Sequence, residues 1–177
     1  DILKHAPYPV TTPSADRNEL EFWMVNDIHG RDSVFRLLIG DAPRQKPDFV
    51  CLNGDLLNSI ESEKALFEGF LASASELLTP AGIPLAVTRG NHDGRGKFAR
   101  HWLDYFPTPT GESYYTFRRG PVFFVVLDGC EDKPDSDIRY YGLSTADAYR
   151  EQQAQWLRGV VSGEEFRSAP YRIVLIH

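Results

Sequence analysis

Three short polar clusters in this chain combine carboxylate, imidazole and amide side chains, and each cluster follows a run of apolar residues. Asp27 and His29 follow the first run, Asp55 follows the second, and Asn91 and His92 follow the third. Parallel strands present their carboxyl ends at one edge of a sheet, where open α/β folds bind ligands. We therefore expect the clusters to meet at one edge and to form a metal site.

The residue types in the first two clusters indicate which metals would bind. Asp27 and His29 are two residues apart, so at the end of an extended strand both side chains would point to the same side. Asp55 follows Gly54, whose missing side chain would let a cation approach the backbone closely, and a bridging role suits this aspartate. Imidazole together with carboxylate favours Zn, Fe, Mn or Ni, whereas an all-oxygen set would favour Mg or Ca.

The third cluster offers both a metal ligand and a proton donor. Asn91 carries a neutral amide oxygen, and His92 stands beside it with Asp93 available to orient the imidazole by hydrogen bonding. Arg95 follows the cluster and is a candidate for binding a substrate phosphate. The alternative, a solvated loop cation, stays open for Arg95.

A fourth apolar run ends at His177, which we expect to be a further metal ligand. A terminal histidine is often only solvated, and this alternative stays open. His5 and His101 are not ligand candidates, because the first lies in a proline-containing lead-in and the second in an expected helix. Each cluster alone could be a turn or ordinary surface polarity. Their occurrence in order, each behind a strand, is what favours a metal site.

The composition is that of an ordinary globular chain. Its 177 residues suffice for one domain, with 42% hydrophobic and 25% charged residues. The formal net charge of −6, without a long basic run, gives no indication of a nucleic-acid-binding surface. No segment approaches the roughly 20 apolar residues of a membrane span. Cys51 is expected in the core, and a disulfide between Cys51 and Cys130 stays open.

The clusters are separated by segments with strand and helix patterns. Residues 1–20 contain several prolines, serines and threonines and are expected to be a lead-in or a linker from a preceding domain. We expect strands at 21–26, 48–53 and 84–88, and helices at 31–39, from Ser59 or Ser62 to residue 79, and at 98–106. This alternation of strands and helices indicates a parallel sheet.

The pattern changes after residue 109. Strands at 113–117 and 122–127 flank the sequence Arg-Arg-Gly-Pro, which is a hairpin signal and indicates antiparallel pairing. A polar segment then leads to a helix at 145–161, followed by the strand that ends at His177. The mixture predicts an α/β fold, a layered α-β-β-α sandwich of mixed sheets flanked by helices.

The expected helix at 145–161 has a weak apolar face. Ala148, Leu157 and Val161 lie roughly on one side of it. We expect this side to pack on a sheet.

The segments NDIHG, NGDLLN, RGNHD and VLIH, in this order, resemble the motifs of the calcineurin-like metallophosphoesterase superfamily. The resemblance covers residues 21–177, which we take as the metallophosphoesterase domain or its N-terminal part. It implies two divalent or trivalent metal ions, with Fe, Mn and Zn as the first candidates. It also implies these roles: Asp27 and His29 on the first metal, Asp55 bridging, Asn91 and His177 on the second, and His92 near the leaving group.

The segment from Leu127 to Leu157 is also similar to secreted bacterial relatives and to purple acid phosphatases, which slightly favours an exported or periplasmic location. Purple acid phosphatases have a tyrosine three residues after the Gly-Asp aspartate, where this chain has Asn58. Their first cluster lacks the histidine that stands here as His29. We therefore expect a colourless or weakly coloured metal site.

The resemblance implies hydrolysis of a phosphate monoester or diester by a dinuclear metal centre. The superfamily also supplies ligands from a Gly-His-x-His cluster, which does not occur in these 177 residues. We expect it in a C-terminal segment beyond His177, so that this chain alone would lack one ligand to each metal. Two alternatives stay open: a catalytically incompetent scaffold or interaction module, and completion of the fold by a second chain.

Overall fold

The apolar runs behind the three polar clusters form a parallel sheet in the computed structural model, which describes residues 7–10 and 18–177. Its strands are β1 (Phe22–Val25), β2 (Phe49–Asn53) and β3 (Leu85–Thr88), in the order β1-β2-β3. All pairs are parallel, with Val25 opposite Leu52 and Asn53 opposite Thr88. The ends of the three strands therefore lie at one edge, as expected. His5 lies outside the described residues.

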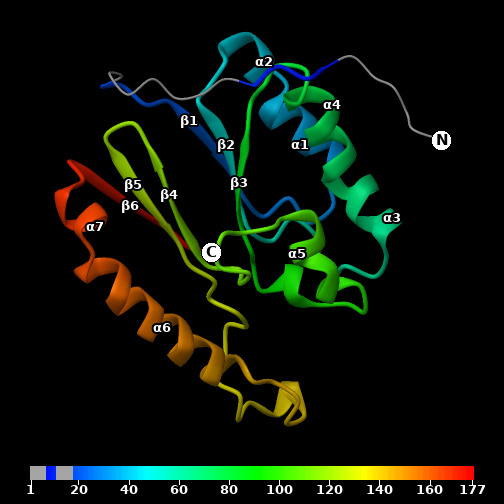
Figure 1. Cartoon of the computed structure of the whole chain (residues 1–177). Helices are drawn as coiled ribbons and strands as arrows, with labels where there is room; N and C mark the ends of the chain where they lie inside the picture. Colours follow the sequence, from blue (N-terminus) through cyan, green and yellow to red (C-terminus); the bar gives the residue numbers. More distant parts are fainter. Residues whose placement is uncertain (1–6, 11–17) are drawn as a thin grey trace.

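Helices cover the outer face of this sheet (Figure 1). They are α1 (Asp32–Ile39), α2 (Ala42–Gln45), α3 (Glu63–Leu66), the π-helical turn η1 (Phe67–Leu71) and α4 (Ala72–Leu78). Of the two expected caps, Ser62 begins α3, and its side chain accepts a hydrogen bond from the backbone N–H of Ala65. The short α2 and the π-helical turn were not expected from the sequence.

The loop after β3 contains three short helices, which are η2 (His92–Gly94), η3 (Ala99–His101) and α5 (Trp102–Tyr105). The last two fill the expected helix at 98–106. Trp102 is buried in the same core as α1 and α4.

The second sheet is mixed. It contains β4 (Tyr115–Arg119), β5 (Val122–Val126) and β6 (Tyr171–Leu175), in the order β4-β5-β6. The β4 and β5 strands form the expected antiparallel hairpin, and β6 lies parallel to β5. The second strand begins where it was expected, but the first extends to Arg119, because only Gly120 and Pro121 form the turn.

The outer face of the second sheet is covered by α6 (Ala146–Ser162) and α7 (Glu164–Ser168), and η4 (Ile138–Tyr140) lies in the loop before them. The expected apolar face of α6 is confirmed for Leu157, which packs on the second sheet, and is wrong for Ala148 and Val161, which are exposed. Besides Leu157, the side that packs on the sheet carries Gln153, Trp156 and Val160, which follow one another at spacings of three and four residues.

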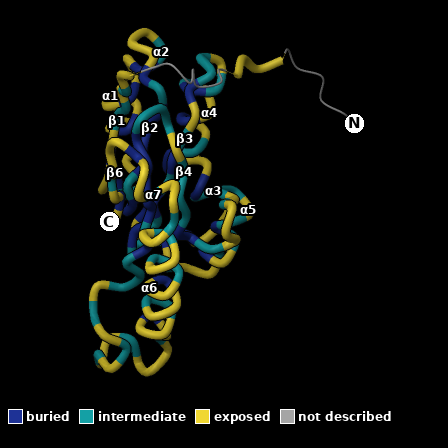
Figure 2. The backbone as a smooth tube through the Cα atoms, turned by 60° about the vertical axis from the view of Figure 1, so that its left-hand side comes forward, coloured by how far each residue is buried: buried dark blue, intermediate teal, exposed yellow. Residues whose placement is uncertain are grey.

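The two sheets pack face to face, which confirms the predicted α-β-β-α sandwich. Their inner faces share a core that includes Phe49 and Cys51 from the first sheet and Phe124 and Leu175 from the second. Figure 2 shows this buried layer between helices whose outer sides are exposed. Both cysteines are free, so the described structure contains no disulfide between Cys51 and Cys130.

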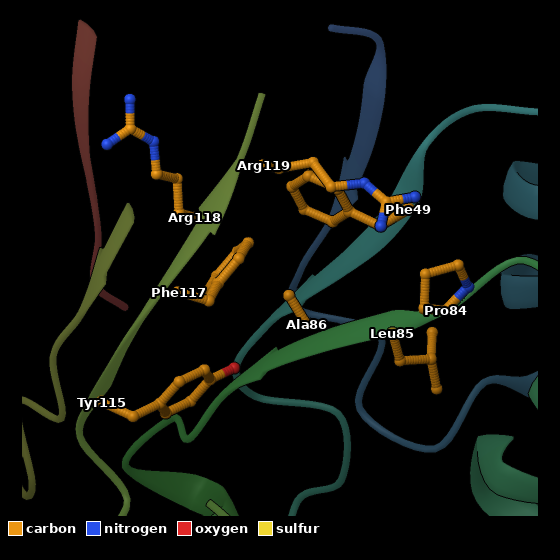
Figure 3. A pocket seen from close by; sticks show the side chains of 8 residues that line it. All are labelled: Phe49, Pro84, Leu85, Ala86, Tyr115, Phe117, Arg118 and Arg119. Atoms are coloured by element: carbon orange, nitrogen blue, oxygen red, sulfur yellow. The ribbon is translucent and has the colours of Figure 1, made fainter. Parts of the chain in front are cut away.

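At the β3 and β4 edges the sheets enclose a pocket of about 250 Å3 (Figure 3). Its walls include Phe49, Phe117 and the side chain of Arg119. Tyr115 bridges the two sheets beside it, because its hydroxyl accepts from the N–H of Val87 at 3.0 Å and donates to the Val87 carbonyl at 3.1 Å. Among the described residues, the helices include none that is long and apolar enough to cross a membrane.

Candidate metal centre

Asp55 lies at the centre of the residues that the sequence singles out. It follows β2, and only 4% of it is exposed. Its Oδ2 atom lies 3.3 Å from His177 Nε2, 3.9 Å from His29 Nε2 and 4.0 Å from His92 Nε2. Three imidazoles from three separate segments therefore converge on one carboxylate oxygen, and His177 reaches it from the second sheet.

Asp27 and His29 join this group through an unexpected backbone geometry. The Oδ1 atom of Asp27 lies 3.6 Å from His29 Nε2, and ligand atoms of Asp27, His29 and Asp55 all lie within 4.8 Å of one another. Their side chains do not converge by extended-strand alternation, because Asp27 and His29 lie beyond the end of β1 and have φ angles of 55° and 51°. The backbone of Asp55 also adopts the left-handed conformation, with a φ angle of 52°.

Left-handed backbone is uncommon for residues other than glycine and costs about 1–3 kcal/mol at each position. Here it is held by hydrogen bonds that continue the pairing of β1 with β2: the N–H of Asp27 donates to the Gly54 carbonyl at 3.1 Å, and that of His29 donates to the Asp55 carbonyl at 3.0 Å. Three such residues in one cluster are typical of a functional site, where the surrounding fold compensates the strain.

Two glycines allow the close approach of the loops. A Cβ atom on Gly54 would lie 2.7 Å from the Cβ of His177 and 2.8 Å from the Cα of Gly90. A Cβ atom on Gly90 would lie 2.2 Å from both the backbone nitrogen and the Oδ1 atom of Asp55. The expectation that Gly54 makes room for a cation is therefore corrected, because its missing side chain makes room for His177 and for the third loop.

His177 is oriented by its contact with β2. Its Nδ1 atom lies 2.8 Å from the carbonyl oxygen of Asn53, which assigns the proton to Nδ1 and turns Nε2 toward Asp55. The Asn53 side chain donates to the carbonyl of Ile176 at 3.3 Å. Asn53 was not singled out from the sequence, although its place immediately before the Gly-Asp pair could have indicated such a role.

Asp93 has a different role from the one expected. Its Oδ1 atom accepts hydrogen bonds from the N–H groups of Leu56 at 2.9 Å and Leu57 at 3.1 Å, and its Oδ2 atom accepts from that of Gly90 at 3.0 Å. Burial raises the pKa of Asp93 to about 6, although these hydrogen bonds oppose the shift. The expectation that Asp93 orients the His92 imidazole is corrected, because both of its oxygens hold the second and third loops together.

His92 is oriented instead by the main chain of Asn58. The Nδ1 atom of His92 lies 3.0 Å from the Asn58 carbonyl oxygen, and the N–H of His92 donates to Asp55 Oδ1 at 3.0 Å. The carbonyl assigns the proton to Nδ1, so Nε2 carries the free lone pair. Because the contact uses only the backbone of residue 58, no side-chain pattern in the sequence could have indicated it.

Arg95 lies beside His92, but its guanidinium is engaged by protein groups. Its Nε and Nη2 atoms donate to the two carboxylate oxygens of Glu131 at 2.9 and 2.7 Å, and its Nη1 atom lies 3.1 Å from His92 Nε2. The hydrogen bonds with Glu131 raise the pKa of Arg95 and those with Arg95 lower the pKa of Glu131. A phosphate would have to compete with this bidentate ion pair. Sequence reasoning missed Glu131, which lies in an irregular loop.

The Asn91 amide lies between Asp55 and Arg95. Its oxygen faces Asp55 and its nitrogen faces Arg95. Only the reverse orientation would hydrogen-bond both ends, with the nitrogen 3.3 Å from Asp55 Oδ1 and the oxygen 2.9 Å from Arg95 Nη2. A metal ion on the Asp55 side would require the oxygen to face it. Asn91 is therefore placed at the centre, with its amide oxygen on the side where a cation would bind.

Next to Asn91 is a pocket of about 260 Å3 that is lined by Arg89, Glu131, Thr145 and Tyr149, among others. Arg89 Nη2 lies 2.5 Å from Oδ2 of Asp128, which is fully buried, and the guanidinium lies 5.8 Å from the centre of the Tyr149 ring. The guanidinium groups of Arg89 and Arg95 are thus each paired with a carboxylate. The pocket therefore has little net charge next to the acidic centre.

The donors present fit a metal centre. Asp27, His29, Asp55 and His177 supply carboxylate oxygens and imidazole nitrogens, the set that suits Zn, Fe and Mn. In addition, the Nδ1 atom of His29 is buried without a hydrogen-bond partner in the described structure. The site thus combines strained backbone, a buried carboxylate and converging imidazole nitrogens, which is the arrangement expected of residues organised around cations.

The fold and this edge of clustered ligands define a metal-binding α/β sandwich, and comparison with known proteins identifies its family. The model of the calcineurin-like phosphoesterase family matches residues 20–177. The chain therefore belongs to this family, as the motifs in its sequence predicted.

Individual relatives are more distant. The serine/threonine-protein phosphatase CPPED1 of Pongo abelii is 28% identical over 133 residues, which cover 75% of this chain and 40% of that protein. The uncharacterized protein C1020.05 of Schizosaccharomyces pombe is 28% identical over 145 residues and is covered over 27% of its length. The chain thus spans less than half of the curated relatives it matches.

Among solved structures, a dimetal phosphatase from Danio rerio is similar with a TM-score of 0.61 and 16% identity, covering 89% of this chain and 69% of that chain. The purple acid phosphatase PPD1 from yellow lupin (Lupinus luteus) seeds is similar with a TM-score of 0.57 and 14% identity, covering 89% of this chain and 30% of that chain. At these identities the likeness establishes the fold alone.

Proposed function

We propose that this chain carries ligands of a dinuclear metal centre that hydrolyses phosphoric esters. The observation that carries the proposal is the convergence of three imidazole Nε2 atoms within 3.3–4.0 Å of one oxygen of the buried Asp55. A carboxylate with imidazoles on several sides is suited to hold two cations at once. Membership of the calcineurin-like phosphoesterase family supports the same reaction class.

The residues would divide between the two cations. Asp27 and His29 would hold one ion, Asn91 and His177 the other, and Asp55 would contribute to both. Bound ions of this kind supply positive charge opposite the phosphoryl oxygens and a water of lowered pKa as the nucleophile. The left-handed residues fix the carboxylates before a ligand arrives, which reduces the cost of organising the site.

His92 would act on the leaving-group side of the phosphorus. The Asn58 carbonyl keeps the proton on Nδ1, so Nε2 is the atom that can exchange a proton with the departing oxygen. The pocket beside Asn91 is adjacent to the centre and would receive the alcohol part of the ester. Arg89 and Arg95 at this pocket are paired with carboxylates, which favours a neutral or weakly charged group there. Neither arginine is free to bind a second anion without losing its carboxylate partner.

The test is metal analysis of the full-length protein together with assays on a chromogenic phosphomonoester and a chromogenic phosphodiester. We expect bound metal and hydrolysis of at least one substrate. Asp55→Asn should lower the content of both metals together, whereas His92→Ala should reduce turnover about 100-fold or more with little change in metal content. A full-length protein that binds metal but hydrolyses neither ester would contradict the proposal and favour the scaffold alternative.

A further inference from the structure

Resting on this proposed function, we infer that Glu131 and Arg95 form a positioning pair that sets the orientation of His92. The pair connects the loop after β5 to the loop after β3, and the two residues are 36 positions apart in the sequence. Neither residue needs to touch the substrate in this role. The inference is carried by the hydrogen-bonding geometry around the guanidinium.

Every donor edge of Arg95 is directed at a group of this site. Nε and Nη2 meet the two oxygens of Glu131, and Nη1 meets His92. A guanidinium is planar and only donates, so a bidentate carboxylate fixes its position and its plane together. Once Glu131 holds two donor atoms, the direction of Nη1 is determined.

The His92 ring is thereby held from two sides. Nδ1 faces the Asn58 carbonyl at 3.0 Å, and the Nη1 atom of Arg95 lies 3.1 Å from Nε2 and 3.3 Å from Nδ1. Because Nη1 lies at nearly the same distance from both ring nitrogens, it restrains the ring as a whole rather than through Nε2 alone. Without Arg95, the ring would keep only one hydrogen bond among the described residues, to Asn58, and its edge contact with the His29 ring.

Glu131 is itself held by the long helix α6. Arg150 of this helix donates from Nη1 to the carbonyls of Gly129 at 3.1 Å and Glu131 at 3.0 Å. The Glu131 side chain is 23% exposed, so the ion pair with Arg95 is partly shielded from solvent. The restraint on His92 therefore extends through the ion pair to a helix of the outer layer.

An alternative role for Arg95, binding the substrate phosphate, predicts a different kinetic effect of changing Glu131. If Arg95 were a phosphate-binding residue restrained by Glu131, then removing the Glu131 charge would free the guanidinium and lower KM. If the pair positions His92, removing that charge lowers kcat, changes KM little, and matters most for leaving groups that need assistance.

The experiment compares Glu131→Gln with Asp132→Asn in the full-length, metal-loaded protein. Asp132 is the matched control, because it is the neighbouring carboxylate and it contacts Lys133 and Tyr140 rather than Arg95. Substrates are aryl phosphate esters of increasing leaving-group pKa. We expect Glu131→Gln to lower kcat about 10-fold or more for the poorest leaving group and less for p-nitrophenyl phosphate, with KM and metal content within twofold of wild type.

A second measurement does not depend on activity. Long-range 1H–15N spectra of the zinc-loaded protein should report one His92 tautomer, protonated on Nδ1, in the wild type and in Asp132→Asn, and shifted or averaged ring signals in Glu131→Gln. In the His92→Ala background, Glu131→Gln should cause no further loss of kcat.

The outcomes separate the two proposals. The positioning pair alone is overturned if the wild type hydrolyses the esters and both variants show the same dependence of kcat on leaving-group pKa. It is also overturned if the His92 spectra of Glu131→Gln are unchanged. A lowered KM in Glu131→Gln overturns it in favour of phosphate binding by Arg95. No hydrolysis by the metal-loaded wild type overturns the proposed function, and the spectra still decide the positioning pair.

Discussion

Replacing Gly90 by alanine tests whether the third loop is placed against Asp55 by a contact that only glycine allows. Gly90 does not have a positive φ, in contrast to Gly54 at φ +81°, so alanine is tolerated by the local backbone conformation. The effect of Gly90→Ala is therefore purely steric. The added Cβ would lie 2.2 Å from the backbone nitrogen and from Oδ1 of Asp55, where an ordinary contact is 3.4 Å or more.

Relief of this overlap requires the two loops to separate by about 1 Å, because one of the clashing groups is main chain and cannot rotate away. A displacement of about 1 Å at a reacting centre costs about 100-fold in rate, which corresponds to about 2.7 kcal/mol. Overpacking also destabilises a fold by about 1–3 kcal/mol. We expect both effects, since the same contact positions Asp55 and joins the loops after β2 and β3.

The assay measures metal affinity by calorimetry, hydrolysis of the ester that the wild type accepts, and urea unfolding. Gly159→Ala is the control, because a Cβ at this position of α6 would meet nothing within 4 Å; it should be neutral or stabilising. The reasoning is refuted if the metal affinity, the turnover and the unfolding equilibrium constant of Gly90→Ala all stay within twofold of wild type. The close packing of Gly90 on Asp55 would then not be what holds the centre in place.

Three further predictions concern burial and ligand type. Asp93→Ala should lower the free energy of unfolding by about 3 kcal/mol or more in urea titrations, because three backbone N–H groups lose their acceptor; a loss below 1 kcal/mol would contradict this. Burial raises the pKa of the Cys51 thiol from 9.0 to about 12, so the folded state binds this proton more tightly than the unfolded chain; its stabilising effect should be complete below pH 9 and lost as the pH rises toward 12. Stability curves of wild type and Cys51→Ala should therefore converge over this range. Finally, the iron-loaded protein should lack an intense visible tyrosinate band, because Asn58 stands at the position of the colour-giving tyrosine; absorption spectroscopy decides it.

Much of the fold follows from local patterns in the sequence. The runs before Asp27, Asp55 and Asn91 form parallel strands, and the Gly120-Pro121 turn joins an antiparallel hairpin, since both patterns depend on residues close together in the chain. Helix faces were less predictable. The packed side of α6 was predicted only at Leu157, because Gln153, a polar residue, pairs with the main chain of buried Asp128 and therefore faces inward.

The supporting contacts of the site required the tertiary structure. Asp93 was expected to orient a neighbouring side chain, but its carboxylate reaches backbone groups of the loop after β2. His92 is oriented by a carbonyl at residue 58 and through Arg95 by Glu131. Every residue has a main-chain carbonyl, so the residue type at position 58 does not indicate this contact. Glu131 lies 36 residues from Arg95 in an irregular loop, so no fixed sequence spacing indicates their pairing.

By itself, the sequence determined which ligand types are present, the order of the strands that carry them and the family to which the chain belongs. Ligand chemistry and strand periodicity are properties of short segments, so they can be recognised before the chain is folded. Only the tertiary structure decided that three histidines surround Asp55, that its neighbouring loops adopt left-handed backbone, and that Gly54 and Gly90 let them touch. These features arise where separate segments meet, and their geometry is set by packing between the segments rather than by either segment alone.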